Sequence, residues 1–327
     1  MQYFEPIWLD HNDRTTDHLT AARLRQLQEQ FKDWASSLRI FCPCQYFQRI
    51  EKTFSDPAIF SQPHELPSDT LKITIQHVRD KFDKAYPWAM GRGKSLPSGY
   101  ILATGKKQYY SGRPNIGFFD SPFKPMLSTL VKLLFQIIPR ACPNHFARGD
   151  ARQLLKLLRT YATTMADKAL RLYNQDLAGF FIGIDITRFL ESWQILLRFL
   201  EPHLSVDENE YFSVSRVKQN NPGDIIKGRT FRTLDVNRHL RIGDIPSLIV
   251  AVLQMQNFQL GSRVYTQVQG SPMGSPLSPA LCLMVASVYE QIGFHTHKES
   301  ITNMHLHALF LRYVDNRLAF IYQPTRF

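Results

Sequence analysis

Two aspartates and one asparagine are the side chains best suited to metal-dependent chemistry in this sequence. Asp185 follows an apolar run over residues 179–184, and the pair Asp315 and Asn316 separates two β-prone runs. Mg²⁺ prefers carboxylate oxygens, and two such ions about 3.5 to 4 Å apart can activate a hydroxyl and steady a leaving pyrophosphate. If their strands are neighbours in one sheet, Asp185 and Asp315 could hold two Mg²⁺ or Mn²⁺ ions.

The first of these acids has two interpretations. The apolar run before Asp185 predicts a buried strand, and apolar residues at helical spacing over 189–200 predict an amphipathic helix after it. An acid at the carboxyl end of a strand is a common place for a site in a mixed sheet. An acid directly before a helix is also a good N-cap. Both interpretations stay open at this point.

A glycine- and proline-rich stretch lies between the two acids. It has the sequence Gln-Val-Gln-Gly-Ser-Pro-Met-Gly-Ser-Pro-Leu-Ser-Pro over residues 267–279, and an apolar run follows over 280–289. Ser278 is a good N-cap and Pro279 a good first helical residue, so we expect a long helix that begins here and closes at Gly293. The glycines would let the backbone of this loop approach a phosphate or a paired nucleic-acid strand.

The rest of the chain predicts a helical N-terminal region over residues 1–95 and a mixed region over 96–327. The mixed region has strand candidates at 100–103, 258–260, 264–266 and 311–322, and helix candidates at 126–138, 151–161 and 246–255. Residues 203–243 are polar and charged and predict an inserted surface loop. The expected fold class is α+β, with packed helices and a largely antiparallel sheet.

The composition limits the classes of protein that this chain can represent. Of its 327 residues 44% are hydrophobic, which is enough for a sizeable core, and a net charge of +11 favours an acidic partner such as nucleic acid. A generically basic protein stays open as the alternative. The acidic N-terminus does not resemble a signal peptide, no apolar run reaches about 18 residues, and four cysteines are too few for a disulfide scaffold. We therefore expect an intracellular protein, nuclear or cytoplasmic, that is neither secreted nor bound to a membrane.

Several segments, in chain order, resemble the motifs of one enzyme family. The Met-Gly-Ser-Pro-Leu-Ser-Pro sequence at 273–279 is similar to an MGSPLSP box, and Tyr-Val-Asp-Asn at 313–316 stands at the position of a YxDD box. Shorter matches occur upstream of these boxes, at Pro97, Tyr100, Leu102, Arg113-Pro114, Ser121-Pro122, Tyr265, Gln267 and Gly270. Together, residues 96–322 resemble a reverse transcriptase, and most closely the Penelope-like reverse transcriptases of eukaryotic retroelements.

The resemblance implies a right-hand polymerase fold with fingers and a palm, in which Asp185 and Asp315 bind two Mg²⁺ or Mn²⁺ ions and Asn316 replaces a second acid. It implies an RNA or DNA template with its primer, and deoxynucleoside triphosphates, as partners. An aromatic residue that selects the sugar is expected five residues after the first aspartate, where this chain has Leu190. The other implied nucleotide contacts are Lys106, Arg113, Gln269, Gly274 and Ser275.

Two features of the motifs leave alternatives. The Gln-Gly-Ser-Pro at 269–272 offers a rival register for the box, and the trailing Leu-Ser-Pro at 277–279 favours the second copy. Asn316 removes one negative charge from the metal site, so an inactive nucleic-acid-binding remnant of the same fold is the alternative function. An RNA-directed RNA polymerase is a third, because some viral enzymes have Asp-Asn at this turn. The chain ends shortly after the hairpin, and we expect a fragment without a thumb.

Overall fold

The computed structural model describes residues 43–62, 66–82, 84–103, 112–147, 151–164, 170–177, 179–203, 207, 209–215, 226–228, 237–254, 256–297 and 308–322. The chain divides into two compact units, Met1–Glu51 and Lys52–Phe327. Helix α2 (Pro43–Phe54) crosses this division, and the helix predicted before it lies outside the described residues. The two compact units divide at residue 51, and the segment after it contributes Val78, Phe82 and Tyr86 to the core of the second unit.

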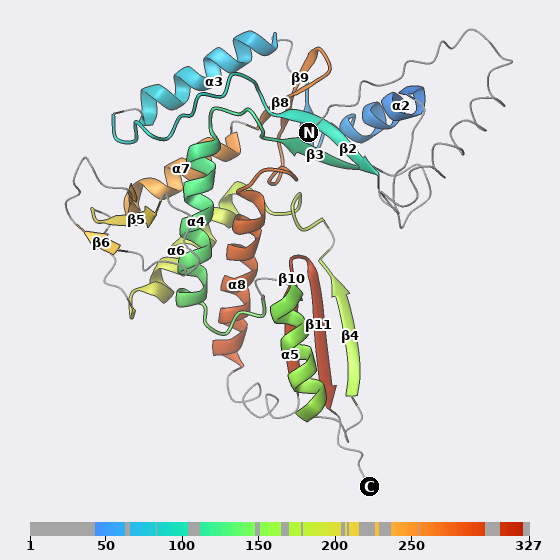
Figure 1. The fold of residues 1–327 in the computed structure, drawn as a ribbon, viewed down its shortest axis with the longest axis vertical. Coiled ribbons are helices and arrows are strands. Elements are labelled where there is room, and N and C mark those ends of the chain that lie inside the picture. Colours follow the sequence, from blue (N-terminus) through green and yellow to red (C-terminus); the bar gives the residue numbers. More distant parts are fainter. Residues whose placement is uncertain are drawn as a thin grey trace, which may run out of the picture. The chain divides into compact units, whose positions relative to one another are not determined.

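The second unit is a mixed α+β structure, as predicted (Figure 1). Its helices are α3 (Pro67–Phe82), α4 (Lys124–Ala141), α5 (Ala151–Thr164), α6 (Ile186–Leu200), α7 (Ile245–Gln254) and α8 (Ser278–Thr296), with a 3₁₀ turn η1 (Ile242–Asp244) before α7. None of the described helices is long and apolar enough to cross a membrane. The strands form three separate sheets.

Helices α4, α6 and α8 pack against one another at the centre of this unit. Their facing side chains are fully buried and include Met126, Leu127, Leu130, Phe189, Trp193, Leu281 and Met284. Helix α4 continues through Pro139 to Ala141, beyond its predicted stop. A proline in the last turn removes only one intrahelical hydrogen bond, so the helix can end after it.

The five-stranded sheet has the order β1 (Phe60–Ser61), β9 (Arg263–Gln267), β8 (Asn257–Leu260), β2 (Ser98–Ala103) and β3 (Gly112–Gly117). All pairs are antiparallel except β2 with β8. The predicted hairpin of β8 and β9 is confirmed, with Gly261 at φ 62° in its turn. Residues 104–110, which include Lys106, lie outside the described part of the chain.

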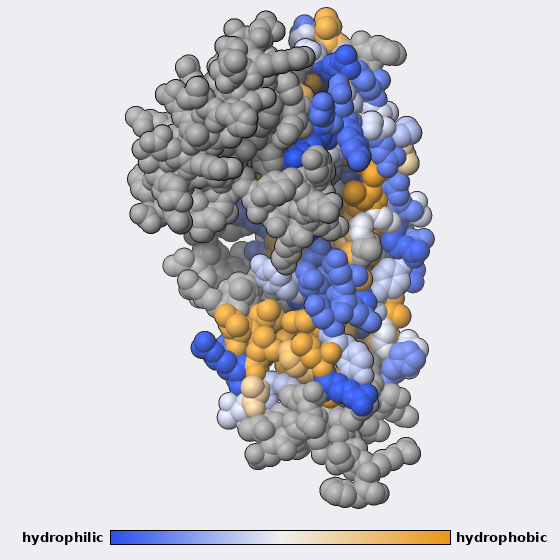
Figure 2. Space-filling view, turned by 90° about the vertical axis from the view of Figure 1, so that its right-hand side faces the viewer, coloured by the Kyte–Doolittle hydropathy of each residue, from blue (hydrophilic) through white to orange (hydrophobic). Residues whose placement is uncertain are grey.

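The second sheet has the order β10 (Ala308–Tyr313), β11 (Asn316–Tyr322) and β4 (Leu170–Asp176), with both pairs antiparallel. The strand predicted over 179–184 is wrong, because these residues form tight turns around Gly179, whose carbonyl accepts hydrogen bonds from Ile182 N and Gly183 N. The true strand β4 lies just before them. Figure 2, which turns the right-hand side of Figure 1 to the viewer, shows apolar groups gathered low on that face, where β4 forms the edge of the sheet.

The third sheet replaces the surface loop predicted over 203–243. It consists of β6 (Ile226–Gly228), β5 (Tyr211–Ser215) and β7 (Asn237–Arg241), in that order. Phe212, Val214 and Leu240 are at most 1% exposed, so alternate residues of β5 and β7 enter the core. The prediction of a loop was wrong because the polar residues between these positions hide the period of two.

Candidate active site

The β10–β11 hairpin ends in a two-residue turn of Val314 and Asp315. Tyr313 pairs with Asn316 across the base of this turn. Asn316 was predicted to lie in the turn, but it is the first residue of β11. Val314 has φ 57°, a left-handed conformation that is strained for a β-branched residue. Asn316 Nδ2 donates a hydrogen bond to Asp315 Oδ1 at 3.1 Å. The acid and the amide therefore lie side by side at the tip of the hairpin.

Asp176, the last residue of β4, lies next to this tip. Its backbone is in register with Asn316 on β11, and Leu177 N donates to Asp315 O at 2.9 Å. Residues in direct cross-strand register have their Cα atoms about 4.5 to 5.5 Å apart. The side chain of Asp176 is exposed. The sheet thus brings two carboxylates and one amide together, and one of these acids was not among the predicted site residues.

Asp185 has a different role from the one that its predicted strand implied. It is the N-cap of α6, with φ −83° and ψ 172°, and its Oδ1 accepts a hydrogen bond from Arg188 N at 2.7 Å. The N-cap interpretation is therefore confirmed and the strand-end interpretation is wrong. The role of Asp185 as a metal ligand stays a prediction, while the strand-end position that was predicted for it is occupied by Asp176.

The glycine- and proline-rich loop packs against the turns that follow β4. Gly270 has φ 75°, and a Cβ atom on it would lie 2.5 Å from Ile182 Cα and from Phe181 O. Ser271 N donates to the same Phe181 carbonyl at 2.8 Å. A glycine is therefore required at 270 for this close approach, and the loop is held beside the residues that follow Asp176.

The long helix after this loop starts where it was predicted but is capped differently. Leu277 is the N-cap of α8 and makes no side-chain cap bond, while the buried Ser278 hydroxyl donates to Pro272 O at 2.6 Å. The serine is thus used to close the loop and not to cap the helix. Gly293 does not end the helix, which continues to Thr296.

The other side of the loop is bonded to strand β3. Ile116 N donates to Met273 O at 2.7 Å. Gly274 has φ 96°, and a Cβ atom on it would collide with the Asn115 side chain and lie 2.5 Å from Ile116 O. The contact with β3 explains why residue 274 is a glycine. Its predicted position against a base pair stays a prediction.

The oxygen donors at the hairpin suit a hard divalent cation. Asp176 and Asp315 supply carboxylates and Asn316 an amide oxygen, and Mg²⁺ often uses one or two carboxylates while substrate phosphates and waters complete its shell. Among the described residues, no group of three or more His, Cys, Asp or Glu side chains could hold a metal ion.

Burial raises the pKa of the Cys282 thiol on α8 to about 12, so this thiol is neutral there.

No protein-family model matches the sequence, and a search of curated proteins finds no match. Solved structures do match its fold. A Candida tropicalis telomerase in complex with a TWJ fragment of telomeric RNA has a TM-score of 0.54 and 11% identity, over 86% of this chain and 39% of that one. An apo telomerase from the same organism, truncated from its C-terminal domain, has a TM-score of 0.51 and 10% identity, over 85% and 47%. These neighbours are telomerase reverse transcriptases. The fold of this chain is reverse-transcriptase-like.

In this reverse-transcriptase-like fold the β10–β11–β4 sheet and the β2–β3 hairpin belong to separate sheets. This chain spans less than half the length of these two telomerase chains, 47% and 39%. The loop over 270–278 touches β3 on one side and the turns after β4 on the other. The loop therefore joins strand β3 to the turns that follow Asp176.

The remaining predicted nucleotide contacts lie at various places around this junction. Arg113 is exposed on β3, and Gln269 is exposed at the start of the loop. Ser275 is only 4% exposed, and its hydroxyl accepts a hydrogen bond from Leu277 N at 3.3 Å. Leu190 is half-buried on α6. The roles of these four side chains toward a nucleotide stay predictions.

Proposed function

We propose that this chain carries the fingers and palm of an RNA-directed DNA polymerase, encoded by a Penelope-like retroelement and acting in the nucleus or cytoplasm. It would extend a primer on an RNA or DNA template with deoxynucleoside triphosphates. The observation that carries the proposal is the register of Asp176 with Asn316 beside Asp315, on strands of a reverse-transcriptase-like palm. The telomerase neighbour bound to an RNA fragment supports a nucleic-acid partner.

Asp176 and Asp315 are the acids that would hold two Mg²⁺ or Mn²⁺ ions, with Asp176 taking the place that the motif comparison assigned to Asp185. When bound, such ions activate the primer hydroxyl and neutralise charge on the phosphates. Asn316 adds a neutral oxygen and orients Asp315 through its amide hydrogen bond. Asp176 ends a strand that is hydrogen-bonded to β11, and Asp315 lies in the tight turn that leads into β11, so their spacing depends on the sheet and not on a flexible loop.

The position of the first acid also restores an aromatic residue at the place where sugar selection is expected. Counted from Asp185, the fifth residue is Leu190, which is aliphatic; counted from Asp176, it is Phe181. The carbonyl of Phe181 accepts the hydrogen bond from Ser271 N, which holds this residue beside the loop. Phe181 would therefore exclude ribonucleotides, and Lys106 and Arg113 would bind the triphosphate from the fingers.

Primer extension on a primed RNA template, in Mg²⁺ and in Mn²⁺, tests this proposal. Asp176→Ala and Asp315→Ala should each lower the rate at least about 100-fold, because each removes a charged ligand. Asp185→Ala should keep the rate within a few fold and lower the free energy of unfolding by about 1 kcal/mol, the usual cost of losing an N-cap. The opposite pattern, in which Asp185→Ala is inactive and Asp176→Ala is active, would return the metal site to Asp185.

A nucleic-acid-binding remnant is the second candidate, and the observation that favours it is Asn316. With an amide in place of the second acid, the site has one negative charge fewer for its ions. This candidate predicts salt-dependent binding of a primer–template, measured by fluorescence anisotropy, with no extension by the wild type in either metal. Extension with ribonucleotides in preference to deoxyribonucleotides would indicate the third candidate, an RNA-directed RNA polymerase.

A further inference from the structure

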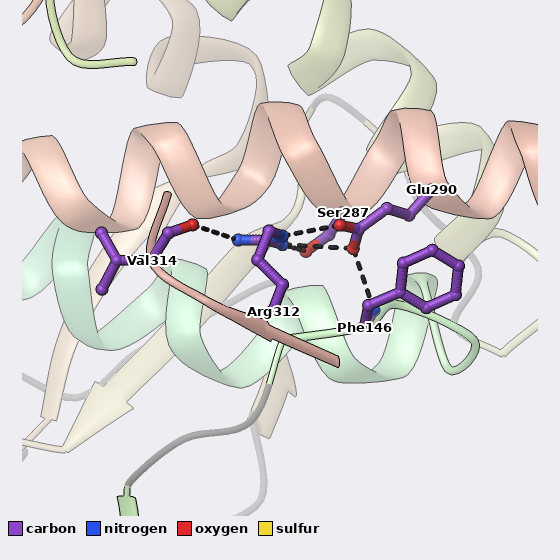
Figure 3. Close-up of polar contacts among 5 residues, drawn as sticks. All are labelled: Phe146, Ser287, Glu290, Arg312 and Val314. Atoms are coloured by element: carbon purple, nitrogen blue, oxygen red, sulfur yellow. Dashed lines mark hydrogen bonds and ion pairs between the residues drawn. The ribbon is translucent and has the colours of Figure 1, made fainter. Parts of the chain in front are cut away.

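Arg312, the residue before the last one of β10, is the centre of a buried polar network that the proposed chemistry does not use (Figure 3). Its side chain is 1% exposed and forms an ion pair with Glu290 of α8, which is 4% exposed. Arg312 Nε donates to Glu290 Oε1 at 2.6 Å and Nη2 donates to Oε2 at 3.2 Å. Nη2 also donates to Ser287 Oγ at 3.3 Å. The guanidinium is thus held in one orientation by two residues one turn apart on α8.

The remaining end of the same guanidinium reaches the catalytic turn. Arg312 Nη1 donates to the carbonyl of Val314 at 3.1 Å. Val314 is the residue with φ 57°, and Asp315 follows it directly. A left-handed conformation is strained for a β-branched residue and persists only where its surroundings hold it there. The hydrogen bond from Arg312 is one of the contacts that hold this turn.

Glu290 ties a third segment into the network. Its Oε2 accepts a hydrogen bond from Phe146 N at 2.9 Å, and Arg312 N donates to Phe146 O at 2.8 Å. Ala147 also forms a parallel bridge with Arg312. The hairpin strand β10 is therefore fixed against α8 both through its backbone and through one buried ion pair.

Helix α8 links this network to the loop that touches the fingers. The helix begins at Ser278, where the loop ends, and Glu290 lies twelve residues later, about 18 Å along the axis at 1.5 Å per residue. One rigid helix thus carries the loop at its start and the anchor of the catalytic turn further along. If Arg312 of β10 moved relative to α8, Asp315 would move relative to the loop and the fingers.

We propose that Arg312 is a positioning residue: it transmits the location of α8 to the Val314–Asp315 turn and so sets where the Asp315 carboxylate stands. This inference rests on the proposed polymerase function. Stability alone does not account for the network, since taking two charges out of water is unfavourable and apolar residues often replace such pairs without loss of stability. An arginine is needed because its planar fork can bind the carboxylate, the hydroxyl and the carbonyl at once, whereas lysine offers a single point charge.

Arg312→Lys tests the proposal, with Arg238→Lys as its matched control. Arg238 on β7 also binds a backbone carbonyl and a hydroxyl, through Nη1 to Pro125 O at 3.0 Å and to Thr129 Oγ1 at 2.8 Å. Both substitutions therefore remove hydrogen bonds to a backbone carbonyl and to a hydroxyl, but Arg312→Lys also removes bonds to a carboxylate, and only Arg312 touches the catalytic turn. We expect Arg312→Lys to lower kcat for primer extension about 100-fold, the scale expected for a misplacement of about 1 Å. The KM for the triphosphate should stay within about threefold, and Arg238→Lys should keep the wild-type kcat.

A second variant covers the case in which Arg312→Lys does not fold. In the double variant Arg312→Met with Glu290→Met, both buried charges are removed together, which leaves no unpaired ion in the core. It should fold with wild-type helix content by circular dichroism and show the same loss of kcat. A kcat within about threefold of the wild type in either folded variant would overturn the proposal, as would an equal loss in Arg238→Lys.

Hydrogen exchange supplies a readout that does not depend on activity. In Arg312→Lys, the amides of residues 313–317 should exchange at least about tenfold faster than in the wild type, while those of α4 and α6 do not change. Arg238→Lys should leave the hairpin amides unchanged. If the wild type extends no primer, the proposed polymerase function fails, and the exchange data still decide the positioning role. Unchanged exchange at the hairpin would refute it.

Discussion

Replacing Gly274 with alanine should destabilise the protein through its contact with strand β3 and not through a bound nucleotide. Gly274 has φ 96°, and a Cβ atom on it would meet the Asn115 side chain and lie 2.5 Å from Ile116 O. The backbone conformation alone costs a residue with a Cβ about 1 to 3 kcal/mol. Moving β3 away would also break the Ile116 N to Met273 O hydrogen bond, worth about 1 kcal/mol. We expect a total loss of about 2 to 4 kcal/mol in the free energy of unfolding.

Gly261→Ala is the matched control for this substitution. Gly261 also has a positive φ, 62°, but no atom lies within 4 Å of the position of its added Cβ. It should therefore show only the conformational cost, about 1 to 2 kcal/mol. Urea denaturation followed by circular dichroism measures both variants, with equal m-values as the sign that the unfolded states are comparable.

The comparison of the two glycines decides between the two explanations of Gly274. A larger loss in Gly274→Ala, by at least about 1 kcal/mol, follows from the collision with β3. If both variants lose the same stability and only Gly274→Ala raises the KM for the triphosphate, residue 274 is a glycine because of the base pair. That result would refute the packing argument.

Two further predictions concern charge. Burial raises the pKa of the Cys142 thiol to about 12 from its ordinary 9.0, with the charge of Glu290 adding to the shift. The stability that the buried, protonated Cys142 thiol contributes is therefore complete below pH 9 and is lost as the pH rises toward 12. Between pH 8 and 10.5 the free energy of unfolding, measured by urea denaturation, should fall by about 2 kcal/mol more in the wild type than in Cys142→Ala. Equal losses would contradict this. Asn316→Asp places a third carboxylate beside Asp176 and should lower the Mn²⁺ concentration for half-maximal primer extension several-fold, and an unchanged concentration would contradict the metal site.

Strong helical periodicity made the central helices predictable. Helices α6 and α8 have apolar residues at spacings of three and four, and these residues are buried against each other in the core. The β8–β9 hairpin was predictable because Gly261 sits between two short β-prone runs. In these segments the local pattern and the tertiary packing favour the same structure.

The interactions around the loop could not be predicted, because they join residues far apart in the sequence. Ser278 has the local signature of an N-cap, yet its hydroxyl is bonded to Pro272 O within a buried loop. Likewise, nothing in the sequence near Arg312 indicates that it pairs with Glu290 on α8. A charged residue on a β-prone run is most simply an exposed one, and only the packing of β10 on α8 makes it a buried anchor.

The sequence pattern pointed to Asp185 and not to Asp176 as the acid at the end of a strand, and the physical cause applies to any strand that borders an open site. A search for strands by hydropathy favours residues 179–184, whose apolar side chains Phe180, Phe181 and Ile184 do pack on or in the core, but from turns. Strand β4 is an edge strand, and its side chains from Arg171 to Asp176 are all exposed. No core requires alternating apolar residues there, so its sequence carries no strand signal. An acid that must reach a metal ion and a phosphate is best placed on such an uncovered strand, which is why the residue most important to the proposed chemistry lies in the segment with the weakest pattern.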